Sequence, residues 1–311
     1  MTDPAHALTP DALRMLRTIA HTGSLAGAAR ALGLVPSALT YRVRQLEDAL
    51  DVLLFDRSAR RARPTAAGAE LLRQAERLER DLHALVHRVK RVATGWEPRL
   101  TIAVDGLIAR PVLMELVQAF YAQQPPTQLR LRDEILSGTV DALSSGLADL
   151  ALGTNAEHSA ATHLHARSLG QVRFVYAVAP QHALARLPEP LADAELLKHR
   201  GVVVADSTRG GPTPSFGVLE GQDALIVSSV ADKLDAHLRG LGAGFLPEPM
   251  ARPHLASGRL VARQVERSTR VARLSYAWSA STVPGKALGW WLAQLEHPVT
   301  RRALLADHRQ R

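Results

Sequence analysis

A helix-turn-helix pattern in the first third of the chain, followed by an arginine-rich segment and a long heptad repeat, constrains the fold most. The pattern covers residues 24–33 and 35–47. Ala28 and Ala29 are small enough for two short helices to approach closely, and Gly33 suits the tight turn after them, where positive φ is needed. Helices joined in this way are used to read the major groove of DNA. The sequence therefore predicts a DNA-binding domain.

Three helices are expected in this domain. The first covers residues 10–21 and buries Leu13, Leu16, Ile19 and Ala20, and Ser24 caps the second. The third runs from Pro36 to about residue 50 and has a core stripe of Leu39, Val43, Leu46 and Leu50. Its opposite face is predicted to bind base edges and phosphates through Pro36, Ser37, Thr40, Tyr41 and Arg44, the alternative being a solvated helix face.

An arginine-rich hairpin is expected after the third helix. A short apolar strand at residues 53–55 leads into a turn that carries Arg57, Arg60, Arg61 and Arg63. A basic hairpin beside a recognition helix is typical of a wing that contacts flanking phosphates. A run of this kind can also be a solvated surface, but its position directly after the third helix favours the wing.

A long helix is predicted to begin after Thr65. Apolar residues follow one another at alternating steps of four and three, which is a heptad seam: Leu71, Ala75, Leu78, Leu82, Leu85, Val89 and Val92. The seam packs either on its own domain or against the same helix of a second chain. Its regularity favours pairing of two chains.

Residues 13–92 resemble the N-terminal region of LysR-type transcriptional regulators. The resemblance rests on residues 23–25, 28–29, 32, 36–40, 46–47, 54–57 and 64–68. Thr40 stands where the family usually has Ser, which keeps the hydroxyl. Asp51 stands where the family usually has Gly, and we expect the turn to survive because Asp tolerates left-handed backbone. The resemblance implies a winged helix-turn-helix with a long linker helix, a homodimer on a pseudo-palindromic operator, and association of dimers into a homotetramer.

Strands and helices alternate through the rest of the chain. Strands are predicted at residues 99–104, 129–136, 148–153, 172–179, 202–205, 225–228, 244–246 and 274–278, and helices at 110–123, 139–145, 230–241 and 285–296. This alternation predicts a mostly parallel sheet with crossover helices, in which ligands bind at the carboxyl ends of strands.

The same resemblance extends to this second part. It implies an α/β effector-binding domain with the two-lobed fold of periplasmic binding proteins. The domains would then be 1–65 (DNA binding), 66–97 (linker and dimerisation) and 98–311 (effector binding), with lobe one at 98–170 plus 272–311 and lobe two at 171–271. Aligning the strand ends with the family pattern places a small-molecule effector between the lobes, against Asp105, Gly106, Leu107, Ser137, Gly138, Gly153, Thr154, Asn155, Ala205, Asp206 and Ser207. Two aspartates there would favour an amide, ureide or phenol over a bare dicarboxylate.

The amino-acid composition limits the kinds of partner and of chemical site that this chain can have. The formal net charge of +8 favours a polyanionic partner, although a GC-rich coding bias also explains the abundance of Arg and Ala. The absence of Cys excludes disulfides, thiolate metal sites and cysteine nucleophiles. No signal peptide and no apolar run that could span a bilayer is recognised, so we expect a soluble, cytoplasmic protein that does not bind membranes.

Catalytic and metal motifs are weak. Gly240, Gly242 and Gly244 follow a helix and precede a strand, which is the reverse of a dinucleotide loop. His163 and His165 lie in a polar connection without a carboxylate or thiolate cluster. We therefore expect no enzyme activity, metal or cofactor. A DNA-tethered enzyme and a constitutive architectural DNA binder are the competing hypotheses. Turnover assays and ligand-dependent footprints would separate them.

Overall fold

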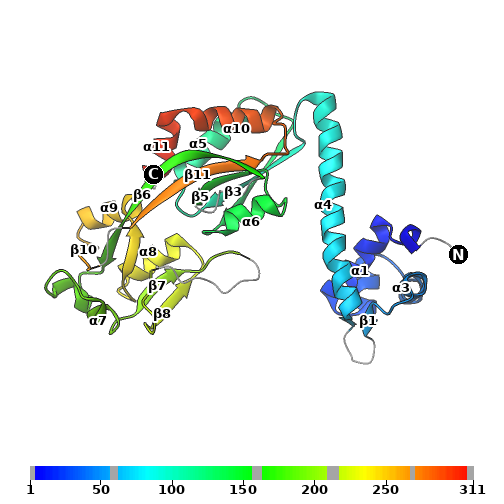
Figure 1. Ribbon diagram of the computed structural model, residues 1–311, viewed down its shortest axis with the longest axis horizontal. Coiled ribbons are helices and arrows are strands. Elements are labelled where there is room, and N and C mark those ends of the chain that lie inside the picture. Colours follow the sequence, from blue (N-terminus) through cyan, green and yellow to red (C-terminus); the bar gives the residue numbers. More distant parts are fainter. Residues whose placement is uncertain (1–3, 57–61, 156–162, 209–216, 267–269, 307–311) are drawn as a thin grey trace. The chain divides into compact units, whose positions relative to one another are not determined.

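The computed structural model describes residues 4–56, 62–155, 163–208, 217–266 and 270–306 (Figure 1). The chain forms two compact units, residues 1–88 and 89–311. Within the described ranges, no helix is both long and apolar enough to cross a membrane.

Unit one begins with a short 3-10 helix, Pro4–Ala7, and three helices: α1 (Pro10–Thr22), α2 (Leu25–Ala31) and α3 (Pro36–Leu50). Their apolar faces share one core, as the helical periodicity predicted. The hydroxyl of Ser24 caps α2 by accepting the N–H of Gly27 at 3.0 Å. Gly33 and Asp51 both have positive φ, 66° and 52°. The turn therefore survives with Asp51 in place of Gly.

A buried carboxylate fixes the segment after α3. Glu47 is 5% exposed and accepts the backbone N–H groups of Leu54 and Phe55, at 2.9 and 3.3 Å. Phe55 then starts a hairpin whose strands are β1 (Phe55–Asp56) and β2 (Arg63–Pro64). Because a carboxylate on α3 holds the strand that follows, the position of the hairpin relative to α3 is fixed by these two hydrogen bonds.

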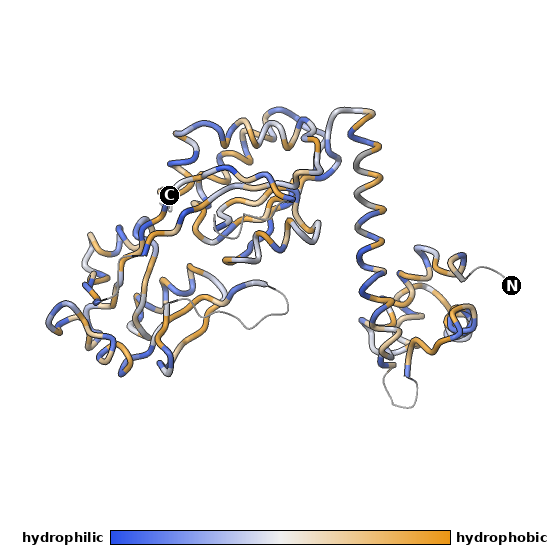
Figure 2. Tube along the Cα trace, viewed as in Figure 1, coloured by the Kyte–Doolittle hydropathy of each residue, from blue (hydrophilic) through white to orange (hydrophobic). Residues whose placement is uncertain are grey.

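The 29-residue helix α4 (Ala66–Thr94) starts at Thr65, whose hydroxyl accepts the N–H of Gly68 at 3.0 Å. A Cβ at Gly68 would lie 2.0 Å from the carbonyl oxygen of Leu54, so only Gly lets the first turn pack there. Apolar residues recur along α4 (Figure 2). Ala75 is buried, but all five later seam positions are exposed: Leu78 by 46%, Leu82 by 39%, Leu85 by 50%, Val89 by 61% and Val92 by 87%.

Unit two is built on a seven-stranded sheet in the order β10-β6-β11-β5-β3-β4, with β9 also paired to β6. The strands are β3 (Arg99–Asp105), β4 (Gln128–Glu134), β5 (Leu150–Asn155), β6 (Leu164–Val178), β9 (Gly244–Pro247), β10 (Val261–Arg263) and β11 (Val271–Ser279). Within this sheet, and among the residues that the structure describes, only the β3–β4 and β3–β5 pairs are parallel. The expectation of a mostly parallel sheet is wrong, because β11 and β6 run antiparallel to their neighbours as they pass between the lobes.

Two layers of helices cover the lobe-one sheet. Large side chains on one face, such as Ile102, Val104 and Tyr276, pack against α5 (Arg110–Tyr121), α10 (Lys286–Glu296) and α11 (Pro298–Ala306). Alanines alternate with them and face α6 (Gly138–Ser144), which packs close on the other side. Figure 1 shows this arrangement around β3, β5 and β11.

The second lobe contains the far end of β6. This strand pairs with β11 as far as Arg173 and with β9 from Phe174 onward. Its other elements are β7 (Gly201–Val204) paired in parallel with β8 (Ala224–Val227), a 3-10 helix (Ala183–Arg186), α7 (Asp193–Leu196), α8 (Val230–Leu238) and α9 (Glu248–Ala256).

Candidate functional site

The exposed face of α3 is the first candidate site. Ser37, Tyr41 and Arg44 are exposed there, and the opposite stripe is in the core. Arg44 has no ion pair or hydrogen bond within the described part of the chain, so its guanidinium can meet a base or a phosphate. Thr40 is only half-exposed, and its hydroxyl donates to the carbonyl of Pro36 at 2.9 Å. Its methyl group and its oxygen remain available to a ligand.

One side chain on this face was not predicted. Gln45 is exposed and its amide donates to the hydroxyl of Tyr41 at 3.0 Å. The signal was present in the sequence, because Gln45 lies four residues after Tyr41, one helical turn further along the same face. A glutamine amide offers both a donor and an acceptor to a base edge.

The predicted wing is only partly described. Arg63 lies on β2 and is exposed. Arg57, Arg60 and Arg61 lie outside the described residues. The hairpin strands that flank them are in place, with Phe55 opposite Pro64 and Asp56 opposite Arg63.

The second candidate site is a cavity of about 80 Å³ between the two lobes of unit two. Lobe one contributes Asp105 at the end of β3 and residues that follow β3 and β4, and lobe two contributes residues of β6, β7, α8 and β9 together with Arg270, just before β11. The lining residues are Asp105, Leu107, Ile135, Leu136, Phe174, Val204, Val230, Lys233, Phe245, Pro247 and Arg270.

The residues predicted to bind an effector divide between this cavity and its surroundings. Asp105 and Leu107 line the cavity. The hydroxyl of Thr154 donates to the carbonyl of Ser275 within the sheet, at 3.1 Å. The remaining predicted positions are not among the residues that line the cavity: Gly106, Ser137, Gly138, Gly153, Thr154, Asn155, Ala205, Asp206 and Ser207.

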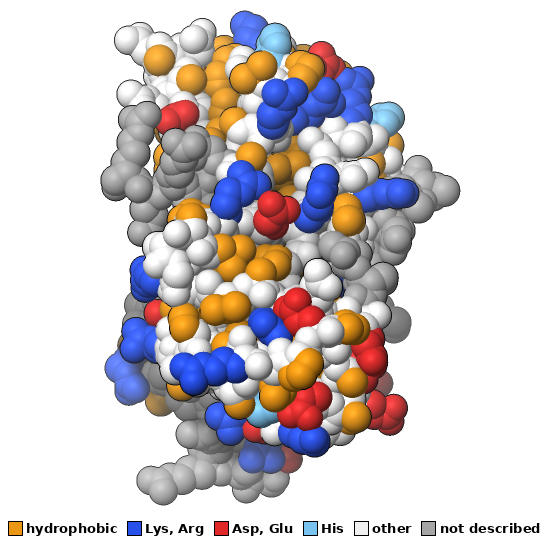
Figure 3. Space-filling model, turned by 90° about the vertical axis from the view of Figure 1, so that its left-hand side faces the viewer, with side chains coloured by type: hydrophobic (Ala, Val, Ile, Leu, Met, Phe, Trp, Pro, Cys, Tyr) orange, Lys and Arg blue, Asp and Glu red, His pale blue; other side chains and the backbone are white. Residues whose placement is uncertain are grey.

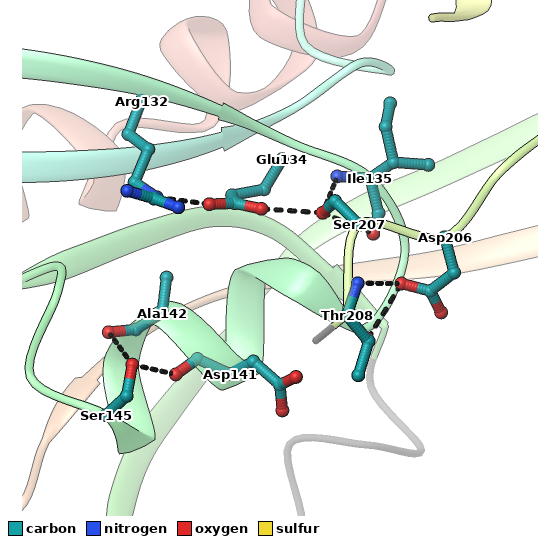
Figure 4. Close-up of polar contacts among 9 residues, drawn as sticks. All are labelled: Arg132, Glu134, Ile135, Asp141, Ala142, Ser145, Asp206, Ser207 and Thr208. Atoms are coloured by element: carbon teal, nitrogen blue, oxygen red, sulfur yellow. Dashed lines mark hydrogen bonds and ion pairs between the residues drawn. The ribbon is translucent and has the colours of Figure 1, made fainter. Parts of the chain in front are cut away.

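Some of these surrounding residues hold the lobes together. The hydroxyl of Ser207 donates to Glu134 at 2.6 Å and accepts the N–H of Ile135 at 2.9 Å (Figure 4). Asp206 accepts the hydroxyl of Ser137 and the N–H of Thr208, the latter at 3.0 Å. We call these six residues the clasp: Glu134, Ile135, Ser137, Asp206, Ser207 and Thr208.

The clasp needs a very close approach of the two loops. A Cβ at Gly138 would lie 1.9 Å from the hydroxyl oxygen of Ser207, so a larger residue would displace that hydroxyl from its hydrogen bonds in the clasp. Burial opposes ionisation of Asp206, but hydrogen bonds from Ser137 and Thr208 outweigh it and lower the pKa of this carboxyl. The polar atoms of the clasp therefore serve contact between the lobes.

Asp105 is the acidic group of the cavity. It is 5% exposed and accepts the N–H groups of Leu107 and Leu136, at 2.9 and 3.0 Å. Burial raises its pKa to about 7, against the opposing effect of those hydrogen bonds. The carboxyl is therefore partly protonated at neutral pH and can both donate and accept hydrogen bonds.

Two cations of the cavity were missed from the sequence. Lys233 is 7% exposed on α8, and Arg270 precedes β11. Lys233 lies three residues after Val230, on the same buried face of the amphipathic helix α8. A lysine at such a position is unusual, and this could have marked it from the sequence as a candidate binding residue. Arg270 had no such signal, because no regular pattern precedes β11.

Other candidate groups remain structural. His163 and His165 are exposed, and the ring of His165 packs beside Trp278. His237 is buried and its ring bonds the carbonyl of Ala177 at 2.9 Å, while burial lowers its pKa to about 3. Over the described ranges, no group of three or more His, Asp or Glu side chains is arranged to hold a metal ion.

Comparisons with known proteins all match this chain to bacterial transcriptional regulators. The family model described as "Bacterial regulatory helix-turn-helix protein, lysR family" matches residues 10–69, and "LysR substrate binding domain" matches residues 93–298. The probable HTH-type transcriptional regulator YhaJ of Escherichia coli K12 is 36% identical, over 93% of this chain and 96% of its own. The transcriptional activator AllS of Klebsiella pneumoniae is 32% identical, over 82% and 95%.

Solved structures share the fold. Full-length CbnR, a LysR family regulator, superposes with a TM-score of 0.61 at 18% identity, covering 96% of this chain and 99% of its own. CbnR in complex with its target DNA superposes with a TM-score of 0.62 at 16% identity, covering 94% and 100%. At these identities the likeness concerns the fold.

Proposed function

Since the chain belongs to the LysR family of bacterial helix-turn-helix transcriptional regulators, we propose that α3 and the hairpin after it bind operator DNA under the control of a small molecule between the two lobes. Its relatives are transcriptional regulators, so the chain is a regulator and not an enzyme. The observation that carries the DNA-binding proposal is the exposed polar face of α3, with Arg44 unpaired within the described ranges, beside a basic hairpin.

The proposed roles divide the chain into three segments. We assign DNA binding to residues 1–65, linking and dimerisation to 66–97 and effector binding to 98–311. The seam of α4 pairs two chains, so that two copies of α3 meet a pseudo-palindromic operator. Two dimers then associate through unit two into a homotetramer. Because its target is bacterial DNA, the regulator acts in the cytoplasm.

Control by a small molecule is supported by the cavity between the lobes. The clasp and the cavity join the same loops, so a ligand that enters the cavity alters the approach of the lobes. A ligand shifts the regulator only by its differential affinity for two arrangements. We therefore expect it to contact both lobes at once.

DNA binding is tested with single arginine substitutions in the full-length protein. Arg44→Ala should alter sequence preference, because it removes a contact to bases. Arg63→Ala should weaken binding to all sequences and reduce the salt dependence by about one phosphate contact. Arg239→Ala, an exposed arginine of lobe two, is the matched control. Unchanged affinity, preference and salt dependence in both test variants would refute the assignment.

A further inference from the structure

The cavity between the lobes is apolar except at three positions. Its walls are Leu107, Ile135, Leu136, Phe174, Val204, Val230, Phe245 and Pro247, and its charged groups are Asp105, Lys233 and Arg270. A ligand that fits is therefore largely apolar and carries a polar group that meets these three side chains.

Lys233 provides the strongest constraint on that polar group. Its side chain is 7% exposed, and no hydrogen bond or ion pair joins its ammonium to any other residue that the structure describes. An ammonium buried without an acceptor is costly. Burial, with repulsion from Arg270, lowers the pKa of Lys233 to about 8, which still leaves it mostly cationic at neutral pH. A bound anion would supply the missing acceptor.

Arg270 lies on the same cavity and adds positive charge. Its guanidinium lies 5.7 Å from the centre of the Phe174 ring. Arg270 repels Lys233 electrostatically, so an anion placed between them relieves that repulsion. Asp105 does not cancel this preference for an anion, because its partly protonated carboxyl can donate a hydrogen bond to the ligand.

A larger arginine-lined hollow is a poorer anion site. It has a volume of about 620 Å³ along β6, between α9 and α11, and is lined by Arg173, Arg252, Arg301 and Arg302 among others. Three of these arginines are exposed and Arg252 pairs with Glu248, so water and counter-charge screen them. Figure 3 shows that Lys and Arg side chains are spread over the face that includes lobe two rather than gathered at one point.

We propose that the effector of this regulator is a compact organic carboxylate with an apolar substituent, whose carboxylate is bound by Lys233 and Arg270. This rests on the proposed function of the cavity as the effector site. The volume of about 80 Å³ is below the roughly 150 Å³ of a cavity that holds benzene, so the substituent is small. The proposal replaces the expected amide, ureide or phenol, because Asp206 belongs to the clasp and a lysine lines the cavity.

Calorimetry on the full-length protein tests this with acids and their neutral amides. The probes are propionate, butyrate and isobutyrate, each beside its amide. Wild type should bind at least one acid and bind its amide roughly 10- to 100-fold more weakly, as expected when a buried charged hydrogen bond is lost. Lys233→Met should lose the same factor for the acid. Lys198→Met removes an exposed lysine that pairs with Glu195 and should bind like wild type.

Two results would overturn the proposal: amides that bind as tightly as their acids, or Lys233→Met that binds the acid with unchanged affinity. A footprint on DNA with each probe separates this failure from failure of the proposed function. Acids that bind through Lys233 without any change in the footprint contradict the regulatory role and leave the carboxylate site standing. A neutral compound that changes the footprint contradicts the carboxylate site alone.

Discussion

Pairing of two chains through α4 can be tested by making its seam polar. Leu78 and Leu82 are 46% and 39% exposed within one chain, and Leu85 is 50% exposed. Leucines left open to water on a continuous stripe are unfavourable unless a second surface covers them. We expect Leu78→Ser with Leu82→Ser to separate the paired chains.

The exposed fractions set the magnitude of this effect. Burying the exposed parts of Leu78 and Leu82 covers nearly the area of one leucine in each chain. Complete burial of a leucine contributes roughly 1.5–3 kcal/mol, so a symmetric pair of chains loses about 3–5 kcal/mol in the variant. At about 1.4 kcal/mol per tenfold change, the dissociation constant of the dimer should rise by roughly 100- to 4000-fold.

Sedimentation of the full-length protein over a range of concentrations measures this shift. Arg73→Ser with Arg77→Ser is the matched control, because these arginines are exposed on another face of α4 and have the same four-residue spacing. The control should keep the oligomeric state of wild type. A seam variant with the oligomeric state and dissociation constant of wild type would refute pairing through this face.

Two further predictions concern unit two. Glu97 is 8% exposed and accepts the N–H groups of Gly285 and Ala287 at the start of α10, at 2.7 and 3.0 Å. Glu97→Ala should therefore lower the free energy of unfolding in denaturant by roughly 2–4 kcal/mol, and Glu97→Gln should lower it less. An alanine variant as stable as wild type would contradict this. The pKa of Asp105 is raised from 3.8 to about 7, so the carboxyl favours folding below pH 4 and this contribution is lost as pH rises to about 7. Asp105→Asn should therefore gain stability relative to wild type across that range, by up to roughly 4 kcal/mol at 1.36 kcal/mol per pKa unit. Melting curves in which the difference stays constant with pH would count against the raised pKa.

The helices of unit one followed from the sequence because their signals are local. Periodicity, the Ser24 cap and Pro36 at the first turn of α3 each act within a few residues, and the observed bounds of α3 agree with those expected. In unit two, α9 and α11 were not predicted. Prolines at 249, 253 and 298 argue against a helix in the sequence pattern, although proline is tolerated in the first turn of a helix.

Sheet direction could not be read from local pattern. The first half of β6 is mostly exposed and polar, so its alternation is weak, and its partner β11 lies about a hundred residues later. The antiparallel crossing of these two strands depends on the packing of both lobes. Parallel strands were therefore expected where antiparallel ones occur.

Strand ends indicated the region of the candidate cavity but not its chemistry. Asp105 and Leu107 line it as expected, whereas Asp206 and Ser207 turn toward Ser137 and Glu134 in the clasp. Whether a polar loop residue faces a ligand or the opposite loop depends on how closely the lobes approach. Sequence patterns do not encode that distance.

The central claim is that occupation of the cavity between the lobes changes how the paired DNA-binding units contact DNA. The most direct test is a footprint of the full-length protein, with and without a bound carboxylate, on a segment that the protein selects from random DNA. We predict that the acid changes the extent of the protected segment for wild type and for Lys198→Met, and leaves it unchanged for Lys233→Met. A footprint that is identical with and without saturating acid in wild type would contradict the account.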